Sequence, residues 1–214
     1  MDSSQIERIT RLVVQEFSNG TNQNVNCDIP IGVSARHVHL AQAHVDVLFG
    51  LGYQLTKHKN LSIPSQFAAN ERVKLVGHKQ SIENVCILGP IRTVSQVEVS
   101  MTDARTLGIS APLRESGNVK GSAPLSIVGP RGTVYLPEGC IVAARHVHMS
   151  PDDATRLGLL NGQDVCARVY GLRATTFYRV KVRVDPSYLL ELHIDTDEAN
   201  AANIKNGDMA ILIK

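Results

Sequence analysis

The chain has 214 residues, of which 43% are hydrophobic, so it is long enough to bury the core of one large domain or two small ones. Its 22 Lys and Arg residues against 20 Asp and Glu residues leave a net charge of +2, which is too small to indicate a nucleic-acid partner. The apolar runs are shorter than a membrane span, and the N-terminus lacks the pattern of a secretory signal. We therefore expect an intracellular protein that does not contact a membrane.

The cysteines give no sign of a disulfide framework. Cys27, Cys86, Cys140 and Cys166 form no CxxC pair, and most of them lie within apolar runs. We expect them to be reduced and to behave as small hydrophobic residues, with a role in metal binding as the alternative.

The N-terminal segment, residues 1–20, contains the pattern of an amphipathic helix over residues 2–17. Its apolar residues recur at spacings of three and four: Ile6, Ile9, Val13 and Phe17. A polar stretch follows, and we expect a flexible linker over residues 21–28. The helix either packs on the rest of the chain or binds a groove of another protein as an address peptide.

From residue 29 onward, short runs rich in Val and Ile alternate with Gly, Pro, Asn and Asp, which is typical of short strands. The runs cover residues 29–33, 73–76, 85–88, 94–99, 125–128, 134–136, 139–144, 164–169, 177–184, 189–194 and 209–213. This spacing predicts a mainly β fold made of small barrels, with short helices. Residues 110–124 have neither a helix nor a strand pattern, and we expect a linker or a lid there.

A six-residue block occurs twice, as ARHVHL at residues 35–40 and as ARHVHM at residues 144–149. In a β-strand, residues two apart point to the same face at a separation of roughly 6.6 Å, so each block presents two imidazoles on one side. Neutral imidazoles at this spacing suit zinc or a similar divalent ion. The alternative is a pair of surface strands that carry histidines without a metal.

A weaker repeat indicates the remaining ligands. Four strands are each followed by a short helix pattern, and in each case a side chain that can bind a metal lies two residues before the start of that pattern. Pseudo-symmetric packing of these units would bring the side chains to one seam. The predicted ligands are His37, His39, Glu98, His146, His148 and His193. Three ligands per ion leave open coordination positions, which is typical of a catalytic site. For Glu98, the alternative is an ordinary solvent-facing residue that binds no metal.

Arg92 follows a Gly-Pro turn and lies six residues before Glu98, so we expect it on the same face of the ligand-bearing strand. A guanidinium beside a metal pair suits a phosphate, because its fork binds two oxygens. An ordinary surface arginine is the alternative. Arg36 and Arg145 point away from the neighbouring histidines, and we expect them to be structural. The chain has no nucleophile elbow, P-loop or Rossmann glycine pattern.

These motifs resemble those of the PduL-type phosphate propanoyltransferases, the phosphotransacylases of bacterial microcompartments. The resemblance covers nearly everything from residue 29 to the C-terminus. It rests on residues 30–39, 88–98, 102–108, 144–151 and 193–201. The family fold consists of two small tandem β-barrels built discontinuously, with the metals between them. By this resemblance, residues 29–36 with 144–214 form the first barrel and residues 37–143 the second.

The resemblance implies transfer of an acyl group between coenzyme A and inorganic phosphate, by direct attack at a di-zinc site. One zinc ion would be held by His37, His39 and Glu98, and the other by His146, His148 and His193. Arg92 matches the phosphate-binding arginine of the family. The coenzyme A contacts that the resemblance implies are Gly32, Val33, Ser34, Lys79, Cys86 and Asn200.

The resemblance also implies partners and a location. Members of the family are commonly homodimers or larger homo-oligomers, and we expect the same of this chain. In some members an N-terminal helix directs the enzyme into the microcompartment lumen through contacts with shell or lumen proteins, and others work in the cytoplasm. A dinuclear metal-dependent hydrolase is the alternative function, because the same ligands and arginine would suit phosphoester cleavage.

Overall fold

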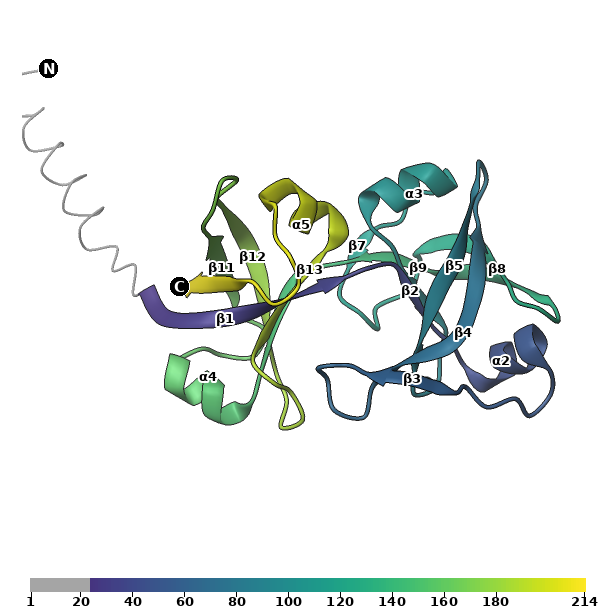
Figure 1. Cartoon of the computed structure of the whole chain (residues 1–214), viewed down its shortest axis with the longest axis horizontal. Coiled ribbons are helices and arrows are strands. Elements are labelled where there is room, and N and C mark those ends of the chain that lie inside the picture. Colours follow the sequence, from purple (N-terminus) through teal and green to yellow (C-terminus); the bar gives the residue numbers. More distant parts are fainter. Residues whose placement is uncertain (1–23) are drawn as a thin grey trace, which may run out of the picture.

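The chain folds into two six-stranded β-barrels that lie side by side (Figure 1). The structure is a computed structural model and describes residues 24–214. The helix expected over residues 2–17 lies outside this range. Among the helices of the described residues, none is long and apolar enough to span a bilayer. The mainly β fold with short helices and two barrels, expected from the sequence, is confirmed.

The first barrel combines the beginning of the described chain with its C-terminal part. Its strands are β1 (Asn24–Ser34), β10 (His146–Met149), β11 (Asp164–Val169), β12 (Thr175–Val184), β13 (Glu191–Asp195) and β14 (Met209–Ile213). They are paired in the order β1-β13-β10-β12-β11-β14, and pairing of β14 with β1 closes the ring.

The second barrel is formed by the middle of the chain. Its strands are β2 (His37–His39), β4 (Phe67–Val76), β5 (Ser81–Gly89), β6 (Gln96–Glu98), β8 (Ala123–Val128) and β9 (Thr133–Ala143). The order is β4-β5-β2-β6-β9, and β8 closes the ring because it pairs with both β9 and β4. Two short strands extend the sheet: β3 (Lys57–Asn60) pairs with β4, and β7 (Leu113–Arg114) pairs with β9.

The chain crosses between the barrels twice, and the duplicated block lies at both crossings. Strand β1 of the first barrel leads into β2 of the second, and β9 of the second leads into β10 of the first (Figure 1). The pairing is equivalent at both places. Strand β2 runs parallel to β5 and antiparallel to β6, whereas β10 runs parallel to β12 and antiparallel to β13. Each His-x-His strand is therefore in the middle of its sheet, next to the other barrel.

The two barrels have separate hydrophobic cores. Val38 is fully buried in the core of the second barrel, and Val147 is fully buried in the core of the first. Because side chains alternate along a strand, the histidines on either side of each valine point away from its core. The division of each block into an apolar face and an imidazole face, expected from the sequence, is confirmed.

Four short helices follow the strands that carry the predicted ligands, as the sequence predicted. They are α2 (Gln42–Phe49), α3 (Met101–Leu107), α4 (Pro151–Leu157) and α5 (Thr196–Ala202). Ser100 and Asp195 begin α3 and α5 with capping boxes, in which the side chains of the cap residue and of the third helical residue each accept a hydrogen bond from the other's backbone N–H. Gly108 and Gly158 end α3 and α4 at φ values of 71° and 60°, in the left-handed region that favours glycine.

Three segments differ from the sequence prediction. Residues 24–28, expected in the linker over 21–28, belong to β1, where Asp28 pairs with Ile211. Strand β7 lies within the predicted loop 110–124, and β3 was not predicted. All four residues of β3 are exposed, so the chain carries no apolar alternation there, and only backbone pairing with β4 makes it a strand. The division of residues 29–214 into two domains stays a prediction.

Candidate functional site

The two His-x-His strands each bring a pair of imidazoles together. The ring centroids of His37 and His39 are 5.0 Å apart, and those of His146 and His148 are 4.6 Å apart. His37, His39 and His148 are buried, and His146 is half-buried. The spacing of two residues along a strand therefore produces the predicted pairs.

A neighbouring antiparallel strand supplies the third side chain to each pair. His37 faces Glu98 of β6 in the strand register, and His146 faces His193 of β13. In each of the two groups, one ligand-capable atom per residue lies within 4.8 Å of the others. We name these the Glu98 group (His37, His39 and Glu98) and the His193 group (His146, His148 and His193).

The charge states of these side chains suit a cation. Burial lowers the pKa of His39 and His146 to about 3 and the pKa of His148 to about 2, so these imidazoles are neutral at pH 7. Burial opposes ionisation of Glu98, but His37 and His39 outweigh it and hold the pKa of Glu98 below its usual range. Neutral imidazoles and ionised carboxylates are the forms that bind metals.

His37 differs from the other histidines. Burial disfavours its charged form, but the facing Glu98 outweighs burial and raises the pKa of His37. The Nε2 atom of His37 lies 3.5 Å from Glu98 Oε2, which explains this attraction. A metal ion bound to the Glu98 group would take the place of the proton, since metal ligands must be deprotonated.

Backbone contacts orient one ring of each pair. The Nδ1 atoms of His37 and His146 each lie 2.9 Å from a carbonyl oxygen two residues earlier, that of Ala35 and that of Ala144. When Nδ1–H donates to this carbonyl, Nε2 is left as an acceptor that can bind a metal. The repeated block therefore repeats the orientation of its first imidazole as well as its sequence.

Several buried nitrogens in the two groups lack a hydrogen-bond partner. Among the described residues, they include Nδ1 of His39 and both ring nitrogens of His148; Nε2 of His193 also has no hydrogen bond, but it lies 3.1 Å from Glu191 Oε2. Buried polar atoms without a partner cost free energy, and they are rare in folded proteins. A bound metal ion at each group would supply the missing partner, so the side chains present fit a divalent ion.

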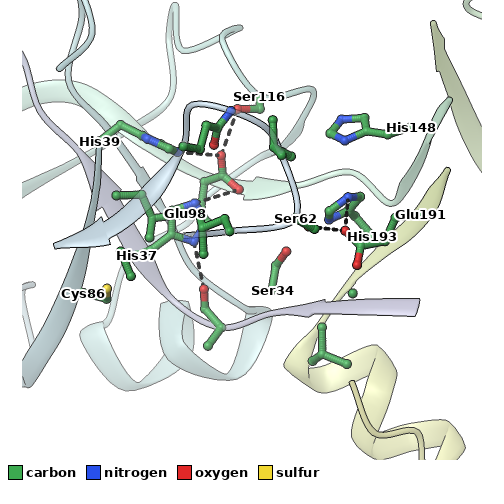
Figure 2. A pocket seen from close by; sticks show the side chains of 18 of the residues that line it. Ser34, His37, His39, Ser62, Cys86, Glu98, Ser116, His148, Glu191 and His193 are labelled. Atoms are coloured by element: carbon green, nitrogen blue, oxygen red, sulfur yellow. Dashed lines mark hydrogen bonds and ion pairs between the residues drawn. The ribbon is translucent and has the colours of Figure 1, made fainter. Parts of the chain in front are cut away.

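Both groups line one cavity of about 760 Å³ between the barrels (Figure 2). Arg92 and Arg183 also line it, so positive charge lies beside both groups. Arg92 lies in the loop between β5 and β6, where its backbone N–H donates to Leu40 O at 2.9 Å. Arg92 thus precedes the strand of Glu98, and it lines the same cavity as Glu98.

Comparison with known proteins decides the family. A family model described as phosphate propanoyltransferase matches residues 30–205, which is more than half of the chain. The chain belongs to the phosphate propanoyltransferase family.

Several curated relatives carry the same name. The phosphate propanoyltransferase of Lachnoclostridium phytofermentans is 54% identical over 214 residues, which is 100% of both chains. That of Priestia megaterium is 52% identical over 99% of this chain and 97% of its own length. That of Salmonella typhimurium is 46% identical over 96% of this chain and 95% of its own length. As a member of the phosphate propanoyltransferase family, the chain is an acyltransferase.

The structure separates the coenzyme A contacts implied by the family resemblance into two sets. Four of them line the cavity: Gly32, Val33, Ser34 and Cys86. The other two do not. The side chain of Lys79 lies against Gly108 at the end of α3, and Asn200 is an exposed residue of α5. Their role as contacts stays a prediction.

Three polar residues in contact with the two groups were not found from the sequence. Gln96 Nε2 donates to Glu98 Oε1 at 2.6 Å, and Ser116 Oγ donates to the same oxygen at 2.9 Å. These contacts hold the Glu98 carboxylate in place. Glu191 lies against His193, with Oε2 at 3.1 Å from His193 Nε2. Gln96 and Glu191 each precede a ligand by two residues, so the period-two spacing that revealed the histidines could have found them.

Proposed function

We propose that the chain transfers a short acyl group between coenzyme A and inorganic phosphate, at a centre that holds two divalent ions. In this reaction, acyl-CoA and phosphate give an acyl phosphate and coenzyme A, and the reverse. The observation that carries the proposal is that both ligand groups and Arg92 line the same cavity. The names of the relatives support the substrate class, because they describe a propanoyl group and phosphate.

The Glu98 group would hold one ion and the His193 group the other. Zinc suits both groups, since each offers two or three imidazoles, and an added carboxylate is a common zinc ligand. Ions bound there would act as Lewis acids that stabilise negative charge on the thioester oxygen. Three protein ligands per ion would leave coordination positions open toward the cavity.

The arginines would bind and orient phosphate. Arg92 is half-buried at the cavity, where its guanidinium can direct two parallel N–H groups at two phosphate oxygens. Arg183 adds a second positive charge from β12 of the other barrel. A phosphate between them would be anchored from both barrels, which restricts its approach to the thioester.

The acyl group would pass directly to phosphate. A phosphate oxygen held by Arg92 would add to the thioester carbonyl carbon, and the carbon–sulfur bond would then break to release the coenzyme A thiolate. Coenzyme A would enter along the end of β1, since Gly32, Val33 and Ser34 line the cavity there. This route forms no acyl bond to the protein, in agreement with the lack of a nucleophile motif in the sequence.

Thiol release from propanoyl-CoA tests this function. The protein should release thiol only when phosphate is present, and propanoyl phosphate should form in equal amount. Thiol release that does not depend on phosphate, without propanoyl phosphate, would instead support the dinuclear hydrolase. Repeating the assay with acetyl-CoA would establish the acyl preference, which depends on the shape of the cavity.

We also propose that residues 1–20 direct the enzyme into a bacterial microcompartment by binding a shell or lumen protein, and that the enzyme is a homodimer or larger. The helix pattern over residues 2–17 supports this, because such a helix has an apolar stripe to bury. Deleting residues 2–17 should leave turnover unchanged and abolish encapsulation. Unchanged encapsulation of the deletion variant would show that residues 2–17 do not direct it. A full-length chain that stays outside microcompartments would favour the cytoplasm.

A further inference from the structure

Two side chains of β10 and two of β13 form a square that contains the His193 group. Glu191 occupies the fourth corner of this square. In the register of β10 and β13, His146 faces His193, and His148 faces Glu191. Residues two apart on a strand share a face, so all four side chains point to the same side of the sheet. Glu191 is half-buried there, and it lines the cavity together with the three histidines.

The equivalent corner of the Glu98 group is occupied by Gln96. There, His37 faces Glu98 and His39 faces Gln96. The two groups therefore differ in the position of the carboxylate. In the Glu98 group the carboxylate is the third ligand and an amide stands at the fourth corner. In the His193 group an imidazole is the third ligand and the carboxylate of Glu191 stands at the fourth corner. Each square thus contains one negative charge.

The contacts of Glu191 connect it to both barrels. Its Oε2 atom lies 3.1 Å from His193 Nε2 and accepts a hydrogen bond from Ser62 Oγ at 2.5 Å (Figure 2). The carboxylate fits beside β1 because residue 32 is a glycine, where a Cβ atom would lie 2.9 Å from Glu191 Cδ. A side chain at position 32 would displace this carboxylate.

Ser62 belongs to the segment between β3 and β4, which reaches from the second barrel to the first. Leu61, Ser62 and Ile63 of this segment line the cavity. The contact between Ser62 and Glu191 therefore holds a loop of one barrel against the strand that carries His193 in the other.

We propose that Glu191 is a positioning residue of the His193 group, which fixes the His193 imidazole for metal binding and ties residues 61–66 to the cavity. The inference rests on the proposed function only in that the His193 group binds a metal ion. The negative charge of Glu191 favours a cation beside three imidazole side chains. Carboxylates in contact with metal-binding histidines typically change metal affinity by about 10- to 100-fold.

Two variants separate the effect of Glu191 on metal binding from its contact with residues 61–66. Glu191→Gln keeps the size of the side chain and an oxygen that accepts from Ser62, but it removes the negative charge. Ser62→Ala keeps the charge and removes the hydrogen bond to the loop. Glu83→Gln is the matched control, because Glu83 is an exposed carboxylate of the second barrel that pairs with Lys74 at the surface.

The affinities for Zn²⁺ are measured by competition with a chromophoric chelator on the metal-free full chain. We expect Glu191→Gln to bind one of two ions about 10- to 100-fold more weakly than wild type, and the other ion with unchanged affinity. Ser62→Ala and Glu83→Gln should bind both ions as wild type does. Wild-type affinity for both ions in Glu191→Gln would overturn the positioning role.

Hydrogen exchange tests whether Glu191 holds residues 61–66 at the cavity. The amides of residues 61–66 should exchange faster in Ser62→Ala than in wild type, and Glu83→Gln should leave their exchange unchanged. Equal exchange in all three proteins would overturn the tie between loop and strand. If the proposed metal centre does not exist, the wild-type chain itself binds no Zn²⁺. This result differs from wild-type affinity in Glu191→Gln, which would overturn only the role of Glu191.

Discussion

The guanidinium of Arg36 lies 2.8 Å from the carboxylate of Asp103 and ties the first crossing between the barrels to α3. The second copy of the block repeats this contact, since Arg145 lies 3.2 Å from Glu198 of α5. Asp103 and Glu198 are both the third residue of a helix that begins with a capping box. The arginines of the repeated block therefore make equivalent ion pairs, which tie each His-x-His strand to the helix after Glu98 or His193. Arg36 also lines the cavity, so the expectation that both arginines are only structural stays a prediction.

Replacement of Asp103 by Ala should lower the free energy of unfolding by about 1 to 2 kcal/mol. The loss combines the Asp103 half of the capping box, worth about 0.5 to 1 kcal/mol, with a smaller contribution from the ion pair, since the side chain of Arg36 is 45% exposed. Urea unfolding of the metal-free protein measures it. Asp152→Ala, which removes an exposed acid from the first turn of α4, is the control and should cost less than about 0.5 kcal/mol. Equal losses of unfolding free energy in the two variants would show that the cap and the ion pair of Asp103 do not stabilise the fold.

Replacement of His146 by Ala should reduce the bound zinc from two ions to one and abolish turnover. Two remaining imidazoles would hold an ion too weakly to survive dialysis, whereas the Glu98 group stays complete. Elemental analysis of the dialysed protein gives the metal content. His78→Ala is the control, because this exposed histidine lies outside both groups and should leave two ions in place. Two ions in dialysed His146→Ala would remove His146 from the ligand set.

Replacement of Arg92 by Ala should reduce phosphate-dependent turnover about 100-fold or more, while the metal content stays the same. The variant loses the charged fork for phosphate, an effect comparable to the loss of a preorganised group that stabilises a transition state. Initial rates of thiol release over a range of phosphate concentrations provide the measurement. Arg131→Ala, at an exposed position, should behave as wild type. Turnover of Arg92→Ala near the wild-type rate would exclude Arg92 from phosphate binding.

The metal-free protein should lose stability as the pH falls from about 6.5 to 5. Burial lowers the pKa of His146 to about 3 and the pKa of His148 to about 2, whereas in the unfolded chain both take up protons near pH 6.5. The unfolded state therefore binds more protons in this window, so lower pH favours it by about 1.4 kcal/mol per pH unit for each histidine. His39, with a pKa of about 3, acts in the same direction.

Urea unfolding of chelator-treated protein at pH 7 and at pH 5 would reveal this loss. His148→Ala should show a smaller difference between the two pH values than wild type, because it has one fewer buried neutral histidine. His37 does not oppose the trend in this window, since its raised pKa gives a contribution that is already complete below pH 6.5. Equal stability of the wild type at pH 7 and pH 5 would contradict the burial of neutral imidazoles.

The pattern of the sequence was sufficient to predict much of the site. The spacing of two residues in His37-Val38-His39 places both imidazoles opposite a core valine wherever the strand lies, because alternation is a local property of an extended chain. The third members, Glu98 and His193, followed from their equal distance to the helix starts. The helices were predictable for the same reason, since caps and stop signals act within a few residues.

Other features required knowledge of which strands pair. Glu191 and Gln96 reach the fourth corners of the two squares through the register of β13 with β10 and of β6 with β2. Ser62 reaches Glu191 across 129 positions in the chain. No local spacing encodes such contacts, and the same holds for Arg183 beside the cavity.

The sequence by itself determined the imidazole pairs, the four helices and the composition of the two ligand groups, because these depend on side-chain alternation and on signals within one turn or strand. Only the tertiary structure decided which strands pair at the crossings, that Arg183 and Glu191 line the cavity, and that Lys79 and Asn200 lie away from it. These outcomes depend on how two closed sheets exchange strands and on the resulting register, which is set by pairing between distant segments.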